Sequence, residues 1–238
     1  MKEFEHNKLP LFYLTPPAPC PYLDGKVERK MFTHLSGQNA DGLNDTLTHA
    51  GFRRSQNILY KHACEECRAC ISVRVKAAEF SPSKGFKRVL KKNSDLLGVH
   101  IRPETNKNQF ELLSRYLESR HKDGGMSDMS IFDYMGMVED TCVDTHLVEY
   151  HTEGGTLAAV CLIDRLSDGL SMVYSFYDPE CDGRSLGTFM ILDQIQRTLD
   201  AGLEHLYLGY WIEGCGKMVY KQRFQPLEKL TETGWEPF

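Results

Sequence analysis

A strand, a polar turn and a helix follow one another in FYDPECDGRSLGTFMILDQI, and this order constrains the fold most. The apolar run ends at Asp178, and an uninterrupted helical pattern begins at Thr188. The turn between them carries Arg184, Ser185 and Gly187. The start of a helix presents free backbone N–H groups and attracts anions. This unit therefore predicts an anionic ligand at the mouth of the helix.

Other strands and helices surround this unit. Residues 108–121 form an amphipathic pattern, and glycine-containing turns separate three strand candidates, which predicts an antiparallel meander. We expect these three strands at 145–151, 156–163 and 170–177, a further strand at 205–211, and a last helix at 216–224 before an irregular tail.

The amino-terminal part reads as a small α/β unit. Prolines exclude helices near its start, a short helix is expected at 43–51, and strands are expected at 58–64 and 70–80. A basic helix then begins at Ser81 or Ser83.

The order of helix, meander and strand–turn–helix–strand resembles the GNAT acyltransferase fold. In that fold the pattern (Arg/Gln)-x-x-Gly-x-(Gly/Ala) holds the pyrophosphate of coenzyme A through backbone N–H groups. Arg184 and Gly187 match this pattern, whereas the bulky Phe189 replaces the second small residue and would obstruct a pyrophosphate. The resemblance implies an acyl carrier other than coenzyme A. We expect an α/β fold of the α+β type, with a GNAT-like domain at 103–238 and a smaller basic domain at 1–102.

The charges are divided unevenly along the chain. Residues 1–100 carry 16 lysines and arginines against 10 acidic residues, whereas residues 101–238 carry 12 against 23. The helix near residue 90 has one wholly basic face, which we expect to contact the phosphates of a polyanion. The basic residues of this face are Lys84, Lys87, Arg88, Lys91 and Lys92.

The cysteine pattern suggests a reducing compartment. Eight cysteines in 238 residues are too sparse for a small disulfide-stapled domain, and Cys64, Cys67 and Cys70 follow a spacing suited to thiols or a metal. The sequence has no signal-peptide pattern and no apolar stretch of membrane-spanning length. We therefore expect a cytoplasmic protein without a membrane partner.

Four blocks of the sequence resemble the bacterial branch of the arginyltransferase family, the aspartate/glutamate leucyltransferases. These blocks are CPYLDGKVERKMFTHL, CEECRACISVRV, SFYDPECDGRSLGTFMILDQIQRTLDAGLEHLYLGYWI and MVYKQRFQPLEKL. The resemblance implies transfer of leucine from leucyl-tRNA to the N-terminal amine of proteins that begin with Asp or Glu, which marks them for N-degron degradation. It also implies a tRNA partner, in agreement with the basic amino-terminal half.

The resemblance also raises the question of a metal. Eukaryotic arginyltransferases have an amino-terminal Cys-x-x-Cys and a later cysteine pair associated with zinc or an iron–sulfur cluster. In this chain Cys20 has lost its partner cysteine, although Cys20, Cys64, Cys67 and Cys70 could supply four thiolates. We expect no metal cofactor.

The implied reaction needs positioning more than a nucleophile, because the aminoacyl ester is already activated. The enzyme must align two substrates, remove a proton from an amine and stabilise an oxyanion. We expect Ser185, Gly187 and Thr188 to form the catalytic helix mouth, with Tyr174 and Tyr210 in the acyl cleft. We expect Arg184, Lys221 and Arg223 to contact tRNA together with the basic helix.

The remaining assignments concern the acceptor and the base. Arg74, or else Arg53, is the expected partner of the acceptor's side-chain carboxylate, since a planar guanidinium suits a carboxylate. His100, His121 and His146 are titratable candidates for a general base.

Three other functions remain open on the sequence. The first is arginyl transfer from arginyl-tRNA, and the second is a GNAT N-acyltransferase that uses acyl-CoA. The third is a thiol-liganded RNA-binding protein without catalysis.

Overall fold

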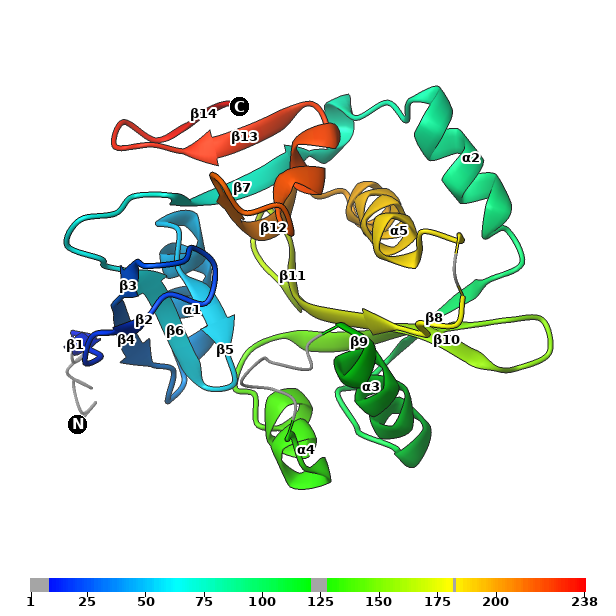
Figure 1. Ribbon diagram of the computed structural model, residues 1–238, viewed down its shortest axis with the longest axis horizontal. Coiled ribbons are helices and arrows are strands. Elements are labelled where there is room, and N and C mark those ends of the chain that lie inside the picture. The colour runs from blue at the N-terminus through cyan, green and yellow to red at the C-terminus, as the bar shows by residue number, and fades with distance from the viewer. Residues whose placement is uncertain (1–8, 121–127, 182) are drawn as a thin grey trace, which may run out of the picture.

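The computed structural model describes residues 9–120, 128–181 and 183–238, and it shows a mixed α/β fold (Figure 1). The strands and helices in chain order are β1 (Tyr13–Leu14), β2 (Ala18–Pro19), β3 (Val27–Glu28), β4 (Lys30–His34), α1 (Ala40–His49), β5 (Arg53–Ser55), β6 (Ile58–His62), β7 (Cys70–Lys76), η1 (Ala77–Glu79), α2 (Lys84–Lys92), β8 (Leu97–Ile101), α3 (Lys107–Arg120), α4 (Ile131–Glu139), β9 (Thr145–His151), β10 (Leu157–Arg165), β11 (Gly169–Tyr177), α5 (Leu186–Asp200), β12 (His205–Ile212), η2 (Val219–Arg223), β13 (Leu227–Leu230) and β14 (Trp235–Pro237).

The large sheet has the strand order β14-β13-β7-β12-β11-β10-β9-β8. The predicted antiparallel meander is confirmed as β9, β10 and β11, and β11 pairs with β12 in parallel after the crossover through α5. Strand β7 lies between β12 and β13, antiparallel to both. The sheet therefore includes strands from both sides of the boundary expected after residue 102.

Helices cover both faces of this sheet (Figure 1). On one face α5 and α2 pack in an apolar cluster that contains Phe86, Met190 and Ile195. On the other face α3 and α4 pack in a second cluster around Leu113 and Tyr134. Both faces are thus buried over β9–β11, which explains the nearly continuous apolar run of β10.

The small sheet has the order β1-β4-β6-β5 and packs against α1 in its own apolar cluster, which includes Leu35 and Leu59. A buried ion pair ties it to the large sheet. Arg54 on β5 donates from Nε and Nη2 to the two carboxylate oxygens of Asp164 on β10, both at 2.6 Å. Thr145 also donates to Asp164.

The amphipathic patterns predicted helices better than edge strands. Ser83 caps α2 as expected, by accepting a hydrogen bond from the Phe86 amide. The prediction of an irregular tail is wrong, because β13 and β14 complete the large sheet there. The unpredicted helix α4 does have a local signal, the capping box between Ser130 and Asp133.

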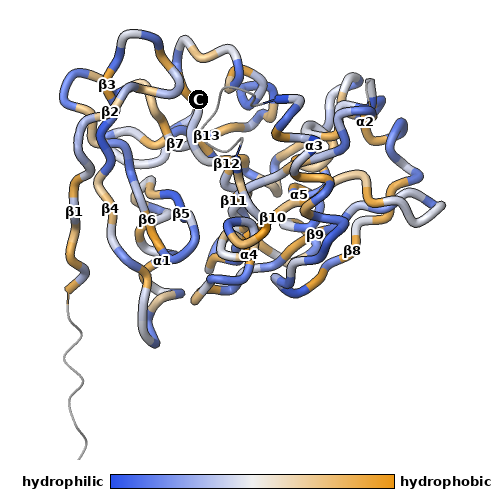
Figure 2. The backbone as a smooth tube through the Cα atoms, turned by 60° about the horizontal axis from the view of Figure 1, so that its bottom comes forward, coloured by the Kyte–Doolittle hydropathy of each residue, from blue (hydrophilic) through white to orange (hydrophobic). Residues whose placement is uncertain are grey.

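The basic run of the amino-terminal half is split in space. The small sheet and α2 lie at opposite ends of the molecule in both orientations (Figures 1 and 2). The basic residues of β5 in the small sheet are therefore remote from those of α2. Within the described residues, no helix combines the length and the apolar character that crossing a membrane requires.

Candidate active site

Strands β11 and β12 form a fork. They pair only through Gly169–Ser171 and His205–Tyr207, and beyond these residues the two strands have no register partners on each other. We use "fork" for the diverging segments, residues 172–177 of β11 and 208–212 of β12. Backbone groups on their facing edges need other partners, because buried peptide groups are normally hydrogen-bonded.

Arg53 enters the fork from the small sheet. Its Nη2 donates to the carbonyl oxygens of Met172 at 2.9 Å and Val173 at 3.2 Å, both on β11. Its guanidinium also lies against Gly209 of β12, which has a positive φ of 74°. Only glycine suits this position, because a Cβ would overlap the guanidinium.

Lys221 contacts the β12 strand of the fork. Its Nζ donates to the carbonyl oxygens of Leu208 at 2.9 Å and Tyr210 at 2.6 Å. The side chain is buried. Burial and the nearby Arg53 lower the pKa of the ammonium to about 7. The predicted contact between Lys221 and tRNA phosphates does not fit this position, because the side chain is buried and Nζ donates to two carbonyl oxygens of β12.

At the mouth of α5, three backbone amides have no hydrogen-bond acceptor among the described residues. The first hydrogen bond of the helix runs from the Phe189 amide to the Ser185 carbonyl, so the amides of Leu186, Gly187 and Thr188 precede it. Ser185 adopts a left-handed conformation with φ of 56°, and its side chain makes no capping bond. A non-glycine residue in this region is strained, and such strain clusters at functional sites.

Phe189 lies elsewhere than expected. Its ring is buried in the core, with its centroid 5.6 Å from that of Tyr150. The expectation that this ring obstructs a pyrophosphate is therefore wrong, since it faces the sheet below the helix. Gly187 is the residue beside the mouth, where a Cβ would lie 3.4 Å from the Tyr177 ring.

The basic face of α2 reaches the mouth of α5. All five of its predicted basic residues are exposed, while Phe86 is buried beneath them. Arg184 donates from Nε to the Asn93 side chain and forms an ion pair with Asp95, just past the end of α2. Lys92 Nζ would lie 3.3 Å from a Cβ at Gly183.

Arg223 joins the same surface. Its guanidinium lies 5.2 Å from the centroid of the Phe86 ring, and the residue is exposed. The structure thus brings together seven of the eight residues predicted to contact tRNA: Lys84, Lys87, Arg88, Lys91, Lys92, Arg184 and Arg223.

The two tyrosines predicted to lie in the acyl cleft, Tyr174 and Tyr210, lie in different surroundings. Tyr174 stands on the diverging part of β11, and burial raises its pKa to about 12. Tyr210 instead faces the small sheet, where its hydroxyl donates to the carbonyl oxygens of Gly51 and Tyr60. The expected place of Tyr210 in the acyl cleft does not fit this role as a link between the sheets.

Sequence reasoning missed an aromatic group around Tyr177 at the end of β11. The Tyr116 ring lies 5.1 Å from the Tyr177 ring, and the guanidinium of Arg120 lies 5.7 Å from it. Both neighbours come from α3, and their helical spacing had indicated only an amphipathic helix.

Arg74 lies in a network of polar contacts at the paired end of β11 and β12. Its Nε donates to Glu228 at 2.7 Å, its Nη1 to the Tyr207 hydroxyl at 2.9 Å and to Asp168 at 3.5 Å. Its guanidinium also lies 4.4 Å from the Trp235 ring centroid. Arg74 is thus already paired with two carboxylates of the chain.

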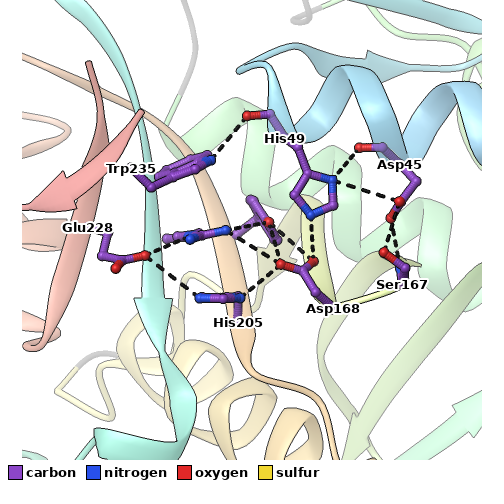
Figure 3. A network of polar contacts seen from close by, with 9 residues as sticks. Asp45, His49, Ser167, Asp168, His205, Glu228 and Trp235 are labelled. Carbon is purple, nitrogen blue, oxygen red and sulfur yellow. Dashed lines mark hydrogen bonds and ion pairs between the residues drawn. The ribbon is translucent and has the colours of Figure 1, made fainter. Parts of the chain in front are cut away.

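Asp168 is the centre of this network. It accepts hydrogen bonds from His205 Nδ1 at 2.9 Å and from the Tyr207 hydroxyl, and His49 Nε2 lies 3.0 Å away (Figure 3). Burial alone would raise the pKa of Asp168, but the hydrogen bonds from His205 and His49 outweigh it and lower the pKa. The hydrogen bond between His49 and Asp168 in turn raises the pKa of His49.

This network is better suited to ion pairing than to a metal. Asp45, His49 and Asp168 place ligand atoms within 4.8 Å of one another, and in the described part of the chain no other group does so. His49 Nδ1, however, lies 2.7 Å from the Asp45 carbonyl oxygen, and Arg74 already provides a cation. Burial raises the pKa of the Cys70 thiol, and the neighbouring Cys64, Cys20 and Cys67 raise it further.

Two of the candidate histidines, His100 and His146, lie away from the fork. The His100 and His146 rings pair at 4.8 Å on the neighbouring strands β8 and β9. Burial and the adjacent His146 lower the pKa of His100. His121 lies outside the described residues.

Family models and relatives cover nearly the whole chain. The model for the C terminus of arginine-tRNA-protein transferases matches residues 108–231, and the model for their N terminus matches residues 18–88. The aspartate/glutamate leucyltransferase of Mesorhizobium japonicum is 55% identical over 239 residues, which cover 96% of this chain and 94% of that protein. That of Afipia carboxidovorans is 56% identical over 238 residues, with coverage of 97% and 94%.

Solved structures show more distant similarity. A tandem GNAT protein from the clavulanic acid biosynthesis pathway gives a TM-score of 0.41 at 12% identity, and covers 85% of this chain and 57% of that chain. Similarity at this level supports no inference about function.

Proposed function

Because the chain belongs to the arginine-tRNA-protein transferase family, we propose that it transfers leucine from leucyl-tRNA to the N-terminal amine of proteins that begin with Asp or Glu. The modified proteins would become substrates for N-degron degradation. The single observation that carries the proposal further is the exposed basic face of α2, which the contacts of Arg184 with Asn93 and Asp95 join to the mouth of α5.

This surface suits a long polyanion with a reactive end. The exposed lysines and arginines of α2 can bind successive phosphates, and Arg184 and Lys92 extend the surface to residues 183–188. The 3′ end of a bound tRNA would then lie at the fork. Lys221 takes no part in this contact.

The mouth of α5 suits the developing charge of acyl transfer. The amides of Leu186, Gly187 and Thr188 can donate to an oxyanion or a phosphate, and the helix dipole favours negative charge there. Tyr174 and the Tyr177 group would line the side of the fork that holds the leucyl chain. No covalent intermediate on the enzyme is needed, since the amine can attack the ester directly.

Arg53 is the better candidate for the acceptor's carboxylate. Among the described residues only its Nη2 has hydrogen-bond acceptors, whereas Arg74 is paired with Glu228 and Asp168. Arg53→Lys should then lose the preference for Asp and Glu over Ala at the acceptor's N-terminus, because a point charge replaces the planar fork of donors.

One assay separates the candidate functions. Purified protein would be incubated with labelled leucyl-tRNA, arginyl-tRNA or acetyl-CoA, and with peptides that begin with Asp, Glu, Lys or Ala. We expect label on the Asp and Glu peptides from leucyl-tRNA alone. Transfer from arginyl-tRNA or acetyl-CoA instead, or tRNA binding without any transfer, would contradict the proposal.

A further inference from the structure

The buried ammonium of Lys221 has no counter-ion in the described part of the chain. The residue is 7% exposed, and no carboxylate among the described residues lies within ion-pair distance of Nζ. Its nearby charged neighbour is another cation, Arg53. A buried charge without an opposite partner is costly, and an apolar side chain would fill the same space at lower cost.

The hydrogen bonds of Nζ leave the lone pair of the neutral amine without a partner among the described residues. A neutral primary amine has two N–H donors and one lone pair, and the carbonyls of Leu208 and Tyr210 account for both donors. The lone pair is then held in a fixed direction. An amine arranged in this way can accept a proton without losing its two hydrogen bonds.

The surrounding groups favour the neutral form. Burial has the largest effect on the pKa of Lys221, Arg53 on β5 lowers it further, and Cys215 after β12 acts in the opposite direction; the resulting pKa is about 7. A substantial fraction of Lys221 is therefore neutral at neutral pH, as efficient proton transfer requires.

The proposed transfer needs such a group, since the acceptor's α-amine has a pKa near ~8 and must lose a proton as it attacks. Resting on that function, we propose that Lys221 is the general base, which takes the proton of the acceptor amine at the fork. The amine nitrogen forms a bond to the leucyl carbonyl carbon, and the bond from this carbon to the ribose oxygen breaks. Lys221 Nζ then returns the proton to the departing ribose oxygen.

The neighbouring Arg53 supports this placement. It lines the opposite edge of the same fork and is our candidate partner for the acceptor's side-chain carboxylate. In an N-terminal Asp or Glu the amine and this carboxylate belong to one residue. Binding the carboxylate at Arg53 would bring the amine to the fork edge that carries Lys221.

Two substitutions distinguish a general base at Lys221 from a residue that only stabilises the structure. Lys221→Met removes the amine, and Lys221→Arg keeps donors for the two carbonyls but stays charged. We expect both to lower kcat by at least about 100-fold, with KM for leucyl-tRNA unchanged, since general bases contribute about 10²–10⁴-fold. Lys217→Met, which removes an exposed lysine of the same segment, is the matched control and should retain activity. Near-normal kcat in Lys221→Arg would overturn the proposal.

Replacement by thialysine gives a test that does not depend on loss of activity. The side-chain sulfur lowers the pKa of the amine, so the low-pH limb of the kcat profile should move to lower pH. An unmoved limb would overturn the role of Lys221. Lysine-detected NMR of the free protein should also show one amine that titrates near pH 7 and is missing in Lys221→Met.

The two proposals fail in different ways. If the wild-type protein transfers no leucine to Asp or Glu peptides, the proposed function fails. If the wild-type protein is active and Lys221→Arg or Lys221→Met is equally active, only the assignment of the base fails.

Discussion

The guanidinium of Arg53 occupies the place where a side chain at position 209 would stand. Arg53 belongs to the small sheet and Gly209 to the central part of the large sheet. Through this contact a side chain of the small sheet enters the fork of the large sheet. The positive φ of Gly209 and the register shift beside it in β12 make room for the insertion.

Gly209→Ala should therefore lower the free energy of unfolding by about 2–4 kcal/mol, because it adds a steric overlap to the strain of a positive φ. Gly155→Ala is the matched control. Gly155 has a similar φ of 81° but nothing within 4 Å of an added Cβ, so we expect a loss of about 1 kcal/mol there. Urea unfolding of both variants measures the difference, and equal losses would show that Arg53 moves aside freely.

The ion pair of Arg54 with Asp164 should be costly to break from one side. Arg54→Met leaves a buried carboxylate without its partner, and we expect a loss of about 3–5 kcal/mol. The double variant Arg54→Met with Asp164→Leu should recover most of this loss. A double variant as unstable as the single one would show that the carboxylate alone is not the cause.

The contact of His49 with Asp168 should make stability depend on pH. The pKa of His49 is raised above the ordinary 6.5 in the folded protein, so its contribution is complete below about pH 6.5 and disappears as pH rises through the folded value. His49→Gln should flatten the stability profile in this window. His34→Gln, at an exposed ring, is the control, and thermal unfolding from pH 5 to 9 provides the measurement.

The basic face of α2 should set the salt dependence of tRNA binding. Lys87→Glu with Lys91→Glu removes two phosphate contacts, so the slope of log K against log salt should fall by roughly 1.5–2. Filter binding at several NaCl concentrations measures the slope. The control is Lys26→Glu with Lys107→Glu, which reverses two exposed charges outside α2. Equal slopes for both double variants would place tRNA elsewhere.

Local patterns predicted the elements but not their partners. The position of Phe86 among the lysines predicts which face of α2 is buried. The polar turn before α5 predicts where that helix begins. The sequence pattern does not show which way the short helix η2 faces, so it does not predict the burial of Lys221. The motif comparison considers only the size of Phe189 and does not show that its ring packs against the sheet. Lys221 is buried because its Nζ donates to carbonyl oxygens of β12. These carbonyls are available because β11 and β12 pair only through Gly169–Ser171 and His205–Tyr207, which the sequence around Lys221 does not reveal.

The place of β7 has a consequence for how the chain is made. During synthesis this strand leaves the ribosome long before β12 and β13, the strands on either side of it. Strand β7 must therefore wait, with both edges unpaired, until β12 and β13 have been translated. A truncated message would yield no half-enzyme, only a chain with an open edge ready to aggregate or be degraded.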